Sequence, residues 1–312
     1  MPKLLRINDF ASSGLNTDIL AWDLPPSFLT EIRNIRIIRN SLQPFGGHVV
    51  WTTLPEGFEP GMLMHVGATS GAYWMIPGDT AVWVWDGNTF SNITRTGFVP
   101  VTDPDLWTGG MLARVPVISN PGSYPHYWMP QDPSQELQLL PWDANNTWED
   151  VNQSCQVMRS HKQFLFALGV KPTGGIGDYI TDGVRWSAPA DVSGIPLTWD
   201  ELDDTDFAGL VTLGGDGGNI IDGMSLRDAF CVYRERSISI FDYVGGNFVW
   251  QIRHLSTSVG LVGSNCIVEV KGRHFFISDA DVMVNDGNSI TSLMHHKICL
   301  LYTSPSPRDI HH

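Results

Sequence analysis

The chain reads Val82-Trp-Val-Trp-Asp-Gly-Asn-Thr-Phe-Ser-Asn-Ile93 and, 200 residues later, Val282-Met-Val-Asn-Asp-Gly-Asn-Ser-Ile-Thr-Ser-Leu293. In both segments a run with alternating valines leads to an Asp-Gly-Asn triplet, after which the apolar pattern resumes, as in a β-hairpin. We expect the triplets to supply the left-handed backbone conformations of two tight turns, formed by Asp86, Gly87 and Asn88 and by Asp286, Gly287 and Asn288. Two hairpins of one design predict a repeated β architecture.

The composition fits short strands joined by many turns. The 312 residues include 31 Gly and 20 Pro, well below the ~25% that marks low-complexity disorder. The 12 Trp, 14 Phe and 7 Tyr supply large apolar side chains for a core. The length allows one or two domains.

Short apolar or alternating runs recur between Gly- and Pro-containing breaks from residue 48 to residue 298, and we group them into five units. The expected strands are 48–53, 62–66, 72–76 and 81–85; 111–119, 127–129 and 137–140; 164–170 and 184–187; 229–234, 237–243 and 248–253; and 266–270, 274–278, 281–284 and a run from 289 onward. The mean spacing of roughly 50 residues is typical of propeller blades. The predicted fold is therefore an all-β, β-propeller-like domain of about five four-stranded blades, with a β-sandwich as the alternative.

Both ends of the chain depart from this pattern. Residues 1–47 resemble an N-terminal arm, in which Pro25 and Pro26 interrupt regular structure and a short helix is expected from Ser27 to about Arg36. Residues 299–312 have no counterpart in the other units and resemble the translation of a sequencing adapter. On this interpretation the natural protein continues beyond Ile298 and the set of blades is incomplete.

Charge and cysteine content exclude several classes of function. The formal net charge is −14, from 19 basic and 33 acidic residues, so the surface as a whole repels phosphate and sequence-specific binding to duplex DNA is not expected. The four cysteines, Cys155, Cys231, Cys266 and Cys299, lack the short spacing of a zinc knuckle or redox motif, and we expect reduced, partly buried thiols. No apolar run predicts a signal peptide or membrane span, so we expect a soluble protein.

Motifs for catalysis, cofactors and metals are weak or incomplete. In Gly67-Ala-Thr-Ser-Gly71 the serine stands one place late for a nucleophile elbow. The glycine clusters at 174–177 and 214–218 lack the spacing of a phosphate loop and are interpreted as turns. The acidic run at 200–206 lacks the final glutamate of a calcium loop, and the adjacent His295 and His296 would point to opposite faces of a strand. We therefore expect no catalytic, cofactor-binding or metal-binding residues.

Acidic residues and tryptophans leave a glycan-active propeller open as an alternative. A glycosidase requires two carboxylates about 5 to 10 Å apart, and the candidates are Asp178, Asp182, Asp191, Asp222, Asp242 and Asp279. Nothing in the sequence singles out one pair among them. The tryptophans Trp74, Trp83, Trp128 and Trp250 suit sugar stacking, but at strand positions aromatic residues are more often part of a core.

A series of phrases resembles a family of virion tail proteins from short-tailed bacteriophages. In the arm the matching residues are Gly14-Leu-Asn-Thr-Asp-Ile-Leu-Ala-Trp-Asp-Leu-Pro-Pro26, Asn34-Ile-Arg36 and Phe45-Gly-Gly47. In the blades they are Pro116-Val-Ile-Ser-Asn-Pro121, Pro125-His-Tyr-Trp128, Val184-Arg-Trp-Ser-Ala-Pro189, Pro196-Leu-Thr-Trp-Asp200, Tyr233-Arg-Glu-Arg-Ser-Ile-Ser-Ile240, Asp242-Tyr-Val-Gly-Gly246 and Gly272-Arg-His-Phe-Phe276. The resemblance covers nearly all of the chain up to residue 298. These are structural phrases and include no catalytic signature.

Members of this family form the tail nozzle, the packaged-DNA stabilisation or tail tubular protein below the portal and adaptor rings. The resemblance implies a structural, non-enzymatic subunit of the virion tail that is assembled in the host cytoplasm and repeated in a ring. Its expected partners are copies of itself, portal and adaptor proteins, and packaged DNA that passes without sequence-specific contact; no membrane contact is expected. A wall rich in carboxylates would let the DNA slide.

The arm has an expected role in assembly. Apolar anchors in a segment outside a folded core often dock on a neighbouring subunit, and the anchors expected here are Trp22, Leu24, Phe28 and Leu29. The alternative function is a glycan-binding or glycan-hydrolysing propeller. The isolated chain would then bind or cleave polysaccharide, whereas a tail component would associate with portal or adaptor rings.

Overall fold

The computed structural model describes residues 14–15, 20, 22–25, 27–31, 33–38, 41–44, 46–47, 49–69, 71–130, 132, 134–172, 174–202, 206–246, 248–279 and 281–293. The chain forms two compact units. One comprises residues 54–279 and 284–290, and the other comprises residues 1–53, 280–283 and 291–312. The expected tail at 299–312, together with Cys299, His295 and His296, lies outside the described residues.

Five four-stranded sheets account for β5 to β24, and in each of them the strands are hydrogen-bonded in chain order. The sheets are β5 (Met64–Ala68), β6 (Gly71–Pro77), β7 (Val82–Trp85) and β8 (Phe90–Asn92); β9 (Thr108–Leu112), β10 (Val115–Ser119), β11 (His126–Tyr127) and β12 (Gln138–Leu139); β13 (Cys155–His161), β14 (Phe164–Val170), β15 (Ile180–Trp186) and β16 (Gly209–Thr212); β17 (Ile220–Leu226), β18 (Ala229–Arg234), β19 (Ile238–Tyr243) and β20 (Trp250–Ser256); and β21 (Ile267–Val270), β22 (Arg273–Ser278), β23 (Asp281–Asn285) and β24 (Ile290–Ser292). A 3-10 turn, η1 (Pro104–Leu106), precedes the second sheet.

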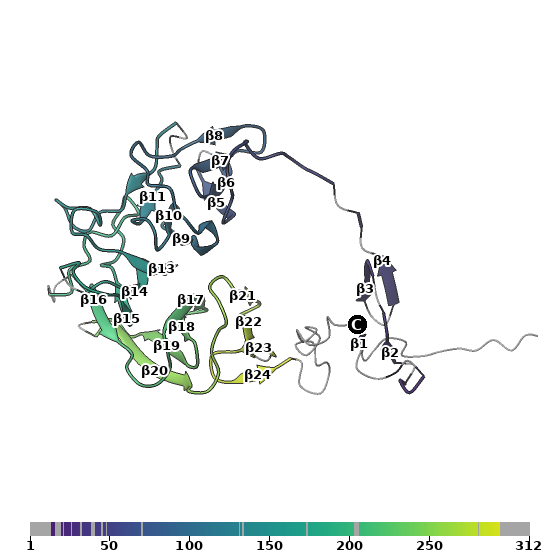
Figure 1. The fold of residues 1–312 in the computed structure, drawn as a ribbon. Coiled ribbons are helices and arrows are strands. Elements are labelled where there is room, and N and C mark those ends of the chain that lie inside the picture. The colour runs from purple at the N-terminus through teal and green to yellow at the C-terminus, as the bar shows by residue number, and fades with distance from the viewer. Residues whose placement is uncertain are drawn as a thin grey trace, which may run out of the picture. The chain divides into compact units, whose positions relative to one another are not determined.

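The sheets follow one another around an arc, with their first strands innermost (Figure 1). Strand β13 contacts β9 on one side and β17 on the other, and β17 in turn contacts β21. This radial arrangement of antiparallel four-stranded sheets is that of a β-propeller. The prediction of about five blades is confirmed, and the alternative of two sheets packed as a sandwich is wrong.

Neighbouring sheets pack face to face through apolar side chains, which is what holds such repeats together. Buried clusters join the first sheet to the second, the second to the third, and the third to the fourth. Phe166 of the third sheet and Phe230 of the fourth stack with ring centroids 4.1 Å apart. Between the fourth and fifth sheets, Tyr233 packs against Phe276 at 5.1 Å. Full burial of one such ring contributes about 1.5 to 3 kcal/mol, so these clusters dominate the stability of the body.

The first and second strands of four successive sheets are joined by the same kind of two-residue turn, which the sequence did not indicate. The first residue of each turn has positive φ although it is not glycine. These residues are Ala113 (φ 44°), Lys162 (φ 53°), Arg227 (φ 55°) and Lys271 (φ 52°). Positive φ matches the twist of short hairpins, and tertiary packing imposes it here without the usual Asn or Gly.

Several expected elements differ from the structure. The helix expected from Ser27 to Arg36 is wrong, because this region contains β2 (Phe28–Leu29) and part of β3 (Ile35–Ile38); β-branched isoleucines favour a strand there. The strand expected at 48–53 is also wrong, since residues 49–53 form no strand and Val49, Val50 and Trp51 are exposed. The first sheet instead takes β8 as its last strand.

Strands β13, β16 and β17 were not predicted. Two of them lie innermost and carry charged residues, Arg159 in β13 and Asp222 in β17, which interrupt the apolar pattern that marks a buried strand. The two side chains neutralise each other across the sheets, as described below. Sequence periodicity cannot reveal such a pair.

The smaller unit contains two short two-stranded sheets. Strands β1 (Gly14–Leu15) and β2 pair in parallel, with Leu15 opposite Leu29. Strands β3 and β4 (Ser41–Pro44) pair antiparallel, with Ile35 opposite Pro44. In the part of the chain that the structure describes, no helix is long and apolar enough to cross a lipid bilayer.

Candidate functional site

The first repeated turn is organised by the carboxylate of Asp86. Its Oδ1 atom accepts hydrogen bonds from the backbone N–H groups of Asn88 at 2.8 Å and Thr89 at 2.7 Å, and Oδ2 accepts one from the Thr89 hydroxyl at 3.0 Å. These bonds lower the pKa of Asp86, with the Thr89 backbone as the largest cause. Only Gly87 has positive φ, at 101°, so the expectation of left-handed conformations at Asp86 and Asn88 is wrong.

The second turn has the same local geometry. Asp286 accepts from the backbone of Asn288 at 2.9 Å and from the backbone and hydroxyl of Ser289 at 2.7 and 3.0 Å. Gly287 has φ 91°, and again the flanking Asp286 and Asn288 do not have positive φ. Four residues of sequence therefore suffice to specify this turn, because every bond in it is local.

The surroundings of the two turns differ. A Cβ atom added to Gly87 would meet open space, whereas one added to Gly287 would lie 2.7 Å from Nη2 of Arg227. Arg227 donates to the carbonyl of Asp286, and Arg253 donates to the carbonyl of Gly287 at 2.9 Å. The second turn is thus held by arginines of the fourth sheet. The structure does not bring the two turns together into one site.

The expected arm anchors all lie in the smaller unit. Trp22 is 78% exposed, whereas Leu24, Phe28 and Leu29 are partly buried. Phe28 and Leu29 form β2, and Leu20 next to this group is 58% exposed. Trp22 is therefore the most exposed of the four expected anchors.

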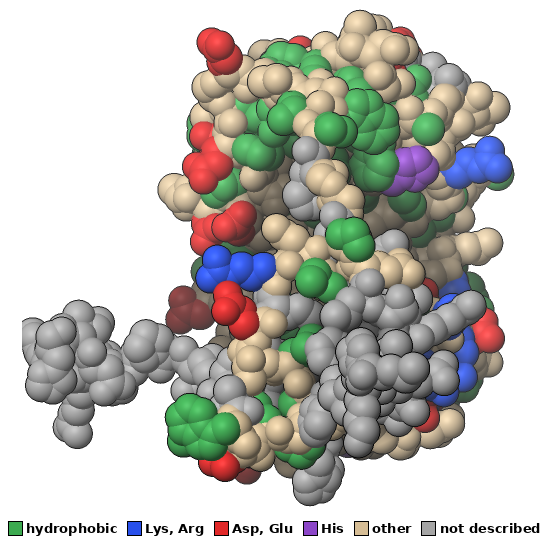
Figure 2. Space-filling view, turned by 90° about the vertical axis from the view of Figure 1, so that its right-hand side faces the viewer, with side chains coloured by type: hydrophobic (Ala, Val, Ile, Leu, Met, Phe, Trp, Pro, Cys, Tyr) green, Lys and Arg blue, Asp and Glu red, His purple; other side chains and the backbone are tan. Residues whose placement is uncertain are grey.

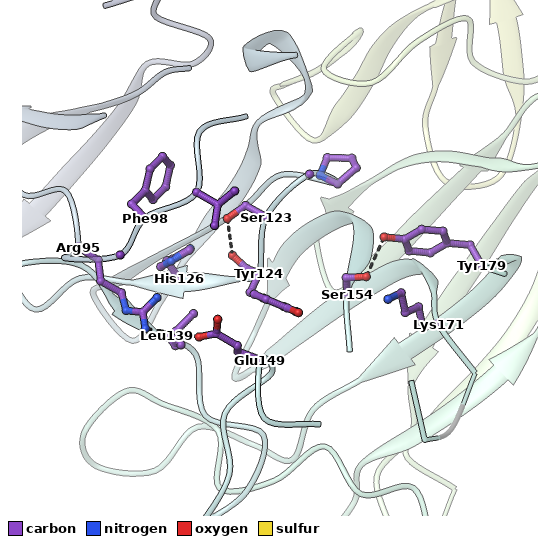
Figure 3. A pocket seen from close by; sticks show the side chains of 14 residues that line it. Arg95, Phe98, Ser123, Tyr124, His126, Leu139, Glu149, Ser154, Lys171 and Tyr179 are labelled. Atoms are coloured by element: carbon purple, nitrogen blue, oxygen red, sulfur yellow. Dashed lines mark hydrogen bonds and ion pairs between the residues drawn. The ribbon is translucent and has the colours of Figure 1, made fainter. Parts of the chain in front are cut away.

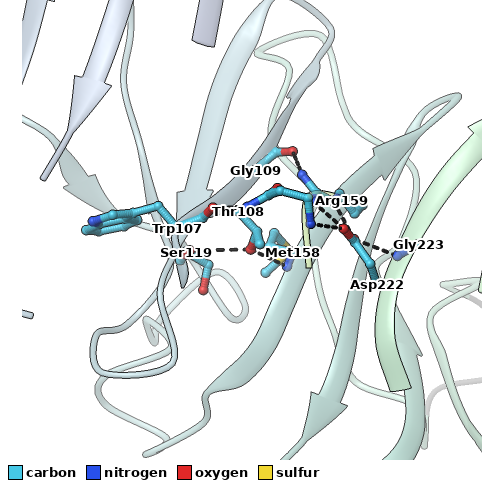
Figure 4. Close-up of polar contacts among 9 residues, drawn as sticks. Trp107, Thr108, Gly109, Ser119, Met158, Arg159, Asp222 and Gly223 are labelled. Carbon is cyan, nitrogen blue, oxygen red and sulfur yellow. Dashed lines mark hydrogen bonds and ion pairs between the residues drawn. The ribbon is translucent and has the colours of Figure 1, made fainter. Parts of the chain in front are cut away.

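The inner strands are joined by an ion pair between Arg159 of β13 and Asp222 of β17 (Figure 4). Nε and Nη2 of Arg159 each donate to one carboxylate oxygen at 2.8 Å. The same carboxylate accepts the backbone N–H of Gly223 at 2.7 Å and that of Asn265 at 2.8 Å. Asp222 is fully buried, and all of its bonds are charge-assisted.

This network extends from the second sheet to the start of the fifth. Arg159 Nη1 donates to the carbonyl of Gly109 in β9 at 3.3 Å, and Arg159 Nη2 donates to the Asn265 side chain at 2.7 Å. The amide of Asn265 donates to the carbonyl of Trp107 at 3.2 Å, although the two residues are 158 positions apart. The network therefore cross-links the inner edges of the blades, and its role is structural.

The other acidic candidates are accounted for in the same way. Asp191 accepts from the backbone of Ser193 at 2.7 Å, Asp182 accepts from the backbone of Gly214 at 2.9 Å, and Asp242 pairs with Arg253 at 2.7 Å. Asp178 and Asp279 are exposed. Most of these carboxylates are thus occupied in turns and ion pairs.

Thiols and metal ligands add no further chemistry in the described residues. Cys155, Cys231 and Cys266 are free thiols, and burial raises the pKa of Cys155 and Cys231 to about 12, so both are poor nucleophiles. Within the described ranges no three His, Cys, Asp or Glu side chains come together as metal ligands. Of the four tryptophans considered for sugar stacking, Trp128 and Trp250 are buried and Trp74 and Trp83 are partly buried.

A pocket of about 270 Å³ lies beside the second sheet (Figure 3). Arg95 and Phe98 come from the segment after β8, and Tyr124 comes from the connection into β11. Lys171 and Tyr179 come from the third sheet's connections. The remaining lining residues are Gly97, Val99, Pro121, Gly122, Ser123, His126, Leu139, Glu149 and Ser154. All belong to the larger unit, so packing of the blades fixes the shape of the pocket.

His126 forms the buried side of this pocket. Its ring lies 5.9 Å from that of Phe98, and neither ring nitrogen has a hydrogen-bond partner among the described residues. Burial, and secondarily the charge of Arg95, lower its pKa to about 4; the backbone of Tyr124 acts in the opposite direction without reaching hydrogen-bond geometry. His126 is therefore an uncharged group at neutral pH.

The charged groups of the pocket are only loosely paired. Arg95 and Glu149 approach to 3.4 Å, with 30% and 43% of their side chains exposed. The nearest partner of the Lys171 ammonium is the Asn152 amide oxygen at 3.5 Å. By contrast, the Tyr179 hydroxyl is firmly bonded to that of Ser154 at 2.7 Å, and burial raises the pKa of Tyr179. Arg95, Glu149 and Lys171 thus retain capacity to bind a ligand.

The sequence did not single out any residue of the pocket or of the inner network, apart from Asp222 among the acidic candidates. Arg95 and Lys171 are 76 positions apart and occur in no common motif. One weak signal was present: Pro125-His-Tyr-Trp128 contains His126 and belongs to the phrases that resemble the tail family.

No protein-family model and no curated protein sequence matches the chain. Among solved structures, the chain is similar to the extracellular domain of a putative hybrid two-component system from B. thetaiotaomicron, with TM-score 0.42 and 9% identity. That match covers 76% of this chain and 33% of that chain, so this chain spans about one third of that protein's length.

Two further solved structures cover most of both chains. A protein of unknown function from Bacteroides caccae has TM-score 0.40 and 10% identity, over 81% of this chain and 84% of that one. YCF48 bound to D1 peptide has TM-score 0.34 and 9% identity, over 77% and 82%. Similarities this distant carry no information about function.

Proposed function

We propose that the chain is a structural protein of a phage tail, part of the tail tube or nozzle that retains and then conducts the packaged genome. The observation that carries the proposal is the division into a cross-linked propeller body and a separate smaller unit with exposed apolar side chains. This is the construction of a subunit that keeps its shape and engages neighbours through an arm. The tail-family phrases in both parts of the sequence agree with it.

Exposed apolar surface also supports assembly. Figure 2 shows hydrophobic side chains gathered on one face, at the height of the β5–β8 sheet in Figure 1. Leu63, just before β5, is 62% exposed, and in the fifth sheet Val268 and Ile277 are 54% and 45% exposed. Neighbouring subunits in a ring would cover such exposed apolar side chains.

The charge supports passage of DNA without binding. With a net charge of −14 the protein repels phosphate. We expect mobility-shift titration to find no complex with duplex DNA at physiological salt. A tight complex of any duplex would contradict a role as a conduit.

The test of the proposal is association of the full chain with portal and adaptor rings encoded beside it. Native mass spectrometry or electron microscopy of the mixture is expected to show rings carrying several copies of the chain. Trp22→Ala is expected to weaken this association at least tenfold, because an exposed aromatic anchor contributes strongly to an interface. The matched control is Val192→Ala, which removes a fully exposed apolar side chain from the propeller body. Failure of the wild-type chain to bind either the portal ring or the adaptor ring would overturn the proposal.

The second candidate function is that of a glycan-binding propeller, and the pocket beside the second sheet is the observation that favours it. The pocket combines aromatic, cationic and carboxylate side chains, as saccharide sites do. A glycan-active protein would bind or cleave a polysaccharide without any tail partner. Release of reducing ends by the isolated chain would favour this candidate over the tail protein.

A further inference from the structure

We propose that the pocket lined by Arg95, Phe98, Tyr124, Glu149 and Lys171 binds one pyranose ring that carries a carboxylate, such as a hexuronate unit of an acidic polysaccharide. The inference does not rest on the proposed function, because a tail component and a free glycan-binding propeller can each carry such a site.

The size of the pocket limits the ligand to a single ring. Its volume of about 270 Å³ lies just below the ~300 Å³ at which pockets for drug-sized ligands begin. The walls come from several separate segments of the larger unit (Figure 3). A polysaccharide could therefore place one unit inside while the rest of the chain lies on the surface.

The polar groups match a ligand that both donates and accepts hydrogen bonds. Arg95 and Lys171 supply donors, Glu149 supplies an acceptor, and the Tyr124 hydroxyl can do both. In the described part of the chain the Tyr124 hydroxyl has no hydrogen-bond partner of its own, so it is available to a ligand. Sugar hydroxyls need this mixture, whereas a simple anion needs donors alone.

The apolar lining suits the C–H groups on the faces of a sugar ring. Phe98, Val99, Pro121 and Leu139 present carbon atoms to the pocket, and the Tyr124 ring adds an aromatic surface. The C–H groups of a pyranose pack against such surfaces while its hydroxyls reach the polar groups. A purely ionic ligand would leave this lining unused.

The charge balance favours a carboxylate on the sugar. Two cations and one carboxylate line the pocket of a protein that is otherwise strongly acidic. Glu149 partly neutralises Arg95, which leaves the loosely held ammonium of Lys171 as the unmatched charge. His126 contributes no charge at neutral pH. One monovalent anion balances the site, whereas a phosphate dianion would be repelled by Glu149.

The test is binding of glucuronate and galacturonate to the full chain, compared with glucose and galactose, by saturation-transfer NMR and calorimetry. We expect both uronates to bind about fivefold more tightly than the matching neutral hexose, as a partly exposed charge contact allows. Lys171→Met is expected to abolish this preference, because it removes the cation that pairs with the carboxylate of the sugar. Glu149→Gln is expected to weaken hexose binding, because it weakens an acceptor for hydroxyl groups.

Controls separate the proposal from simpler explanations. Lys162→Met removes a lysine that lies outside the pocket, and it is expected to leave the affinities for uronate and hexose unchanged. Thermal melting checks that each variant is folded, and the Lys171→Met chain is expected to associate with portal and adaptor rings like wild type. Absence of sugar binding with ring association intact would refute only the present inference.

Three other outcomes would also overturn the inference. The first is equal affinity for uronate and hexose, and the second is an unchanged preference in Lys171→Met. The third is displacement of the uronate by acetate or inorganic phosphate at equal concentration, which would show that the site recognises an anion and not a sugar.

Discussion

Aspartate is used in two opposite ways in the propeller body. Asp86 is exposed and Asp286 is partly buried, and both carboxylates bond only to groups two and three residues further along the chain. Asp222 is fully buried and bonds to Arg159 and Asn265, which are 63 and 43 residues away. The side chain is the same, but the information that places its partners is local in one case and tertiary in the other.

This difference indicates on which carboxylates the stability of the fold depends. An exposed turn aspartate competes with water, so its loss leaves groups that water can satisfy. A buried aspartate that pairs with a partly buried arginine cannot be removed without leaving an uncompensated charge between the blades. The predictions below test this contrast in order of expected effect.

Removal of the buried carboxylate is expected to have the largest effect. Asp222→Ala leaves Arg159, whose side chain is 13% exposed, without its counter-charge, and we expect a loss of about 3 to 5 kcal/mol in the free energy of unfolding by urea denaturation. The control is Asp228→Ala, which breaks the exposed pair with Lys162 and is expected to cost at most about 1 kcal/mol. Equal losses in the two variants would remove the contrast between buried and exposed aspartates.

Substitution of the two turn glycines is expected to rank next. Gly87→Ala and Gly287→Ala each force a Cβ into positive φ, at a cost of about 1 to 2 kcal/mol. Gly287→Ala also displaces Arg227 from the carbonyl of Asp286, which adds about 1 kcal/mol. In an Arg227→Ala background the two glycine substitutions are expected to lower the free energy of unfolding by the same amount. A difference that persists there would show that Arg227 is not its cause.

Removal of the turn carboxylates is expected to have a smaller effect. Asp86→Ala and Asp286→Ala each lose three local hydrogen bonds of nearly equal length. We expect both to lower the melting temperature slightly, by less than either glycine substitution. Calorimetry of the pair should give matching shifts; a clearly larger shift for one of them would mean that its carboxylate supports more than its own turn.

Acid is expected to produce the smallest effect attributable to these turns. Hydrogen bonds hold the pKa of Asp86 and Asp286 below the ordinary value of 3.8. Their contribution to stability is therefore complete above pH 3.8 and is lost as the pH falls through the lower folded-state pKa. Urea denaturation between pH 5 and pH 2 should show a shallower decline for Asp86→Asn than for wild type. An identical decline in both proteins would contradict the assignment.

Much of the fold was predictable because its signals are local. Alternating valines and an Asp-Gly-Asn triplet indicated the hairpins β7–β8 and β23–β24, and the regular spacing of strand signals indicated a repeated β fold. The helix expected from Ser27 to Arg36 was wrong because weak helix signals were outweighed by β-branched isoleucines in β3. Strands β13 and β17 were missed because the charged residues that break their apolar pattern find partners only in the folded protein.

The pocket was not predictable for a related reason. Its cations, its carboxylate and its aromatic side chains come from segments that share no motif, and only the packing of neighbouring sheets brings them together. Of its lining residues, only Pro121 and His126 lay within phrases noted in the sequence. Nothing in those phrases indicates that the His126 ring is buried beside Phe98.

The amino-acid sequence by itself determined the class of fold and the chemistry of the repeated turns, because those depend on hydrogen bonds and side-chain alternation within a few residues. Tertiary structure alone decided that Arg159 meets Asp222, that Arg227 and Arg253 hold one of the two turns, and that Lys171 and Arg95 line one pocket. The physical reason is distance along the chain. Contacts between residues tens of positions apart exist only after the blades have packed, and no local pattern records which side chains will then face each other.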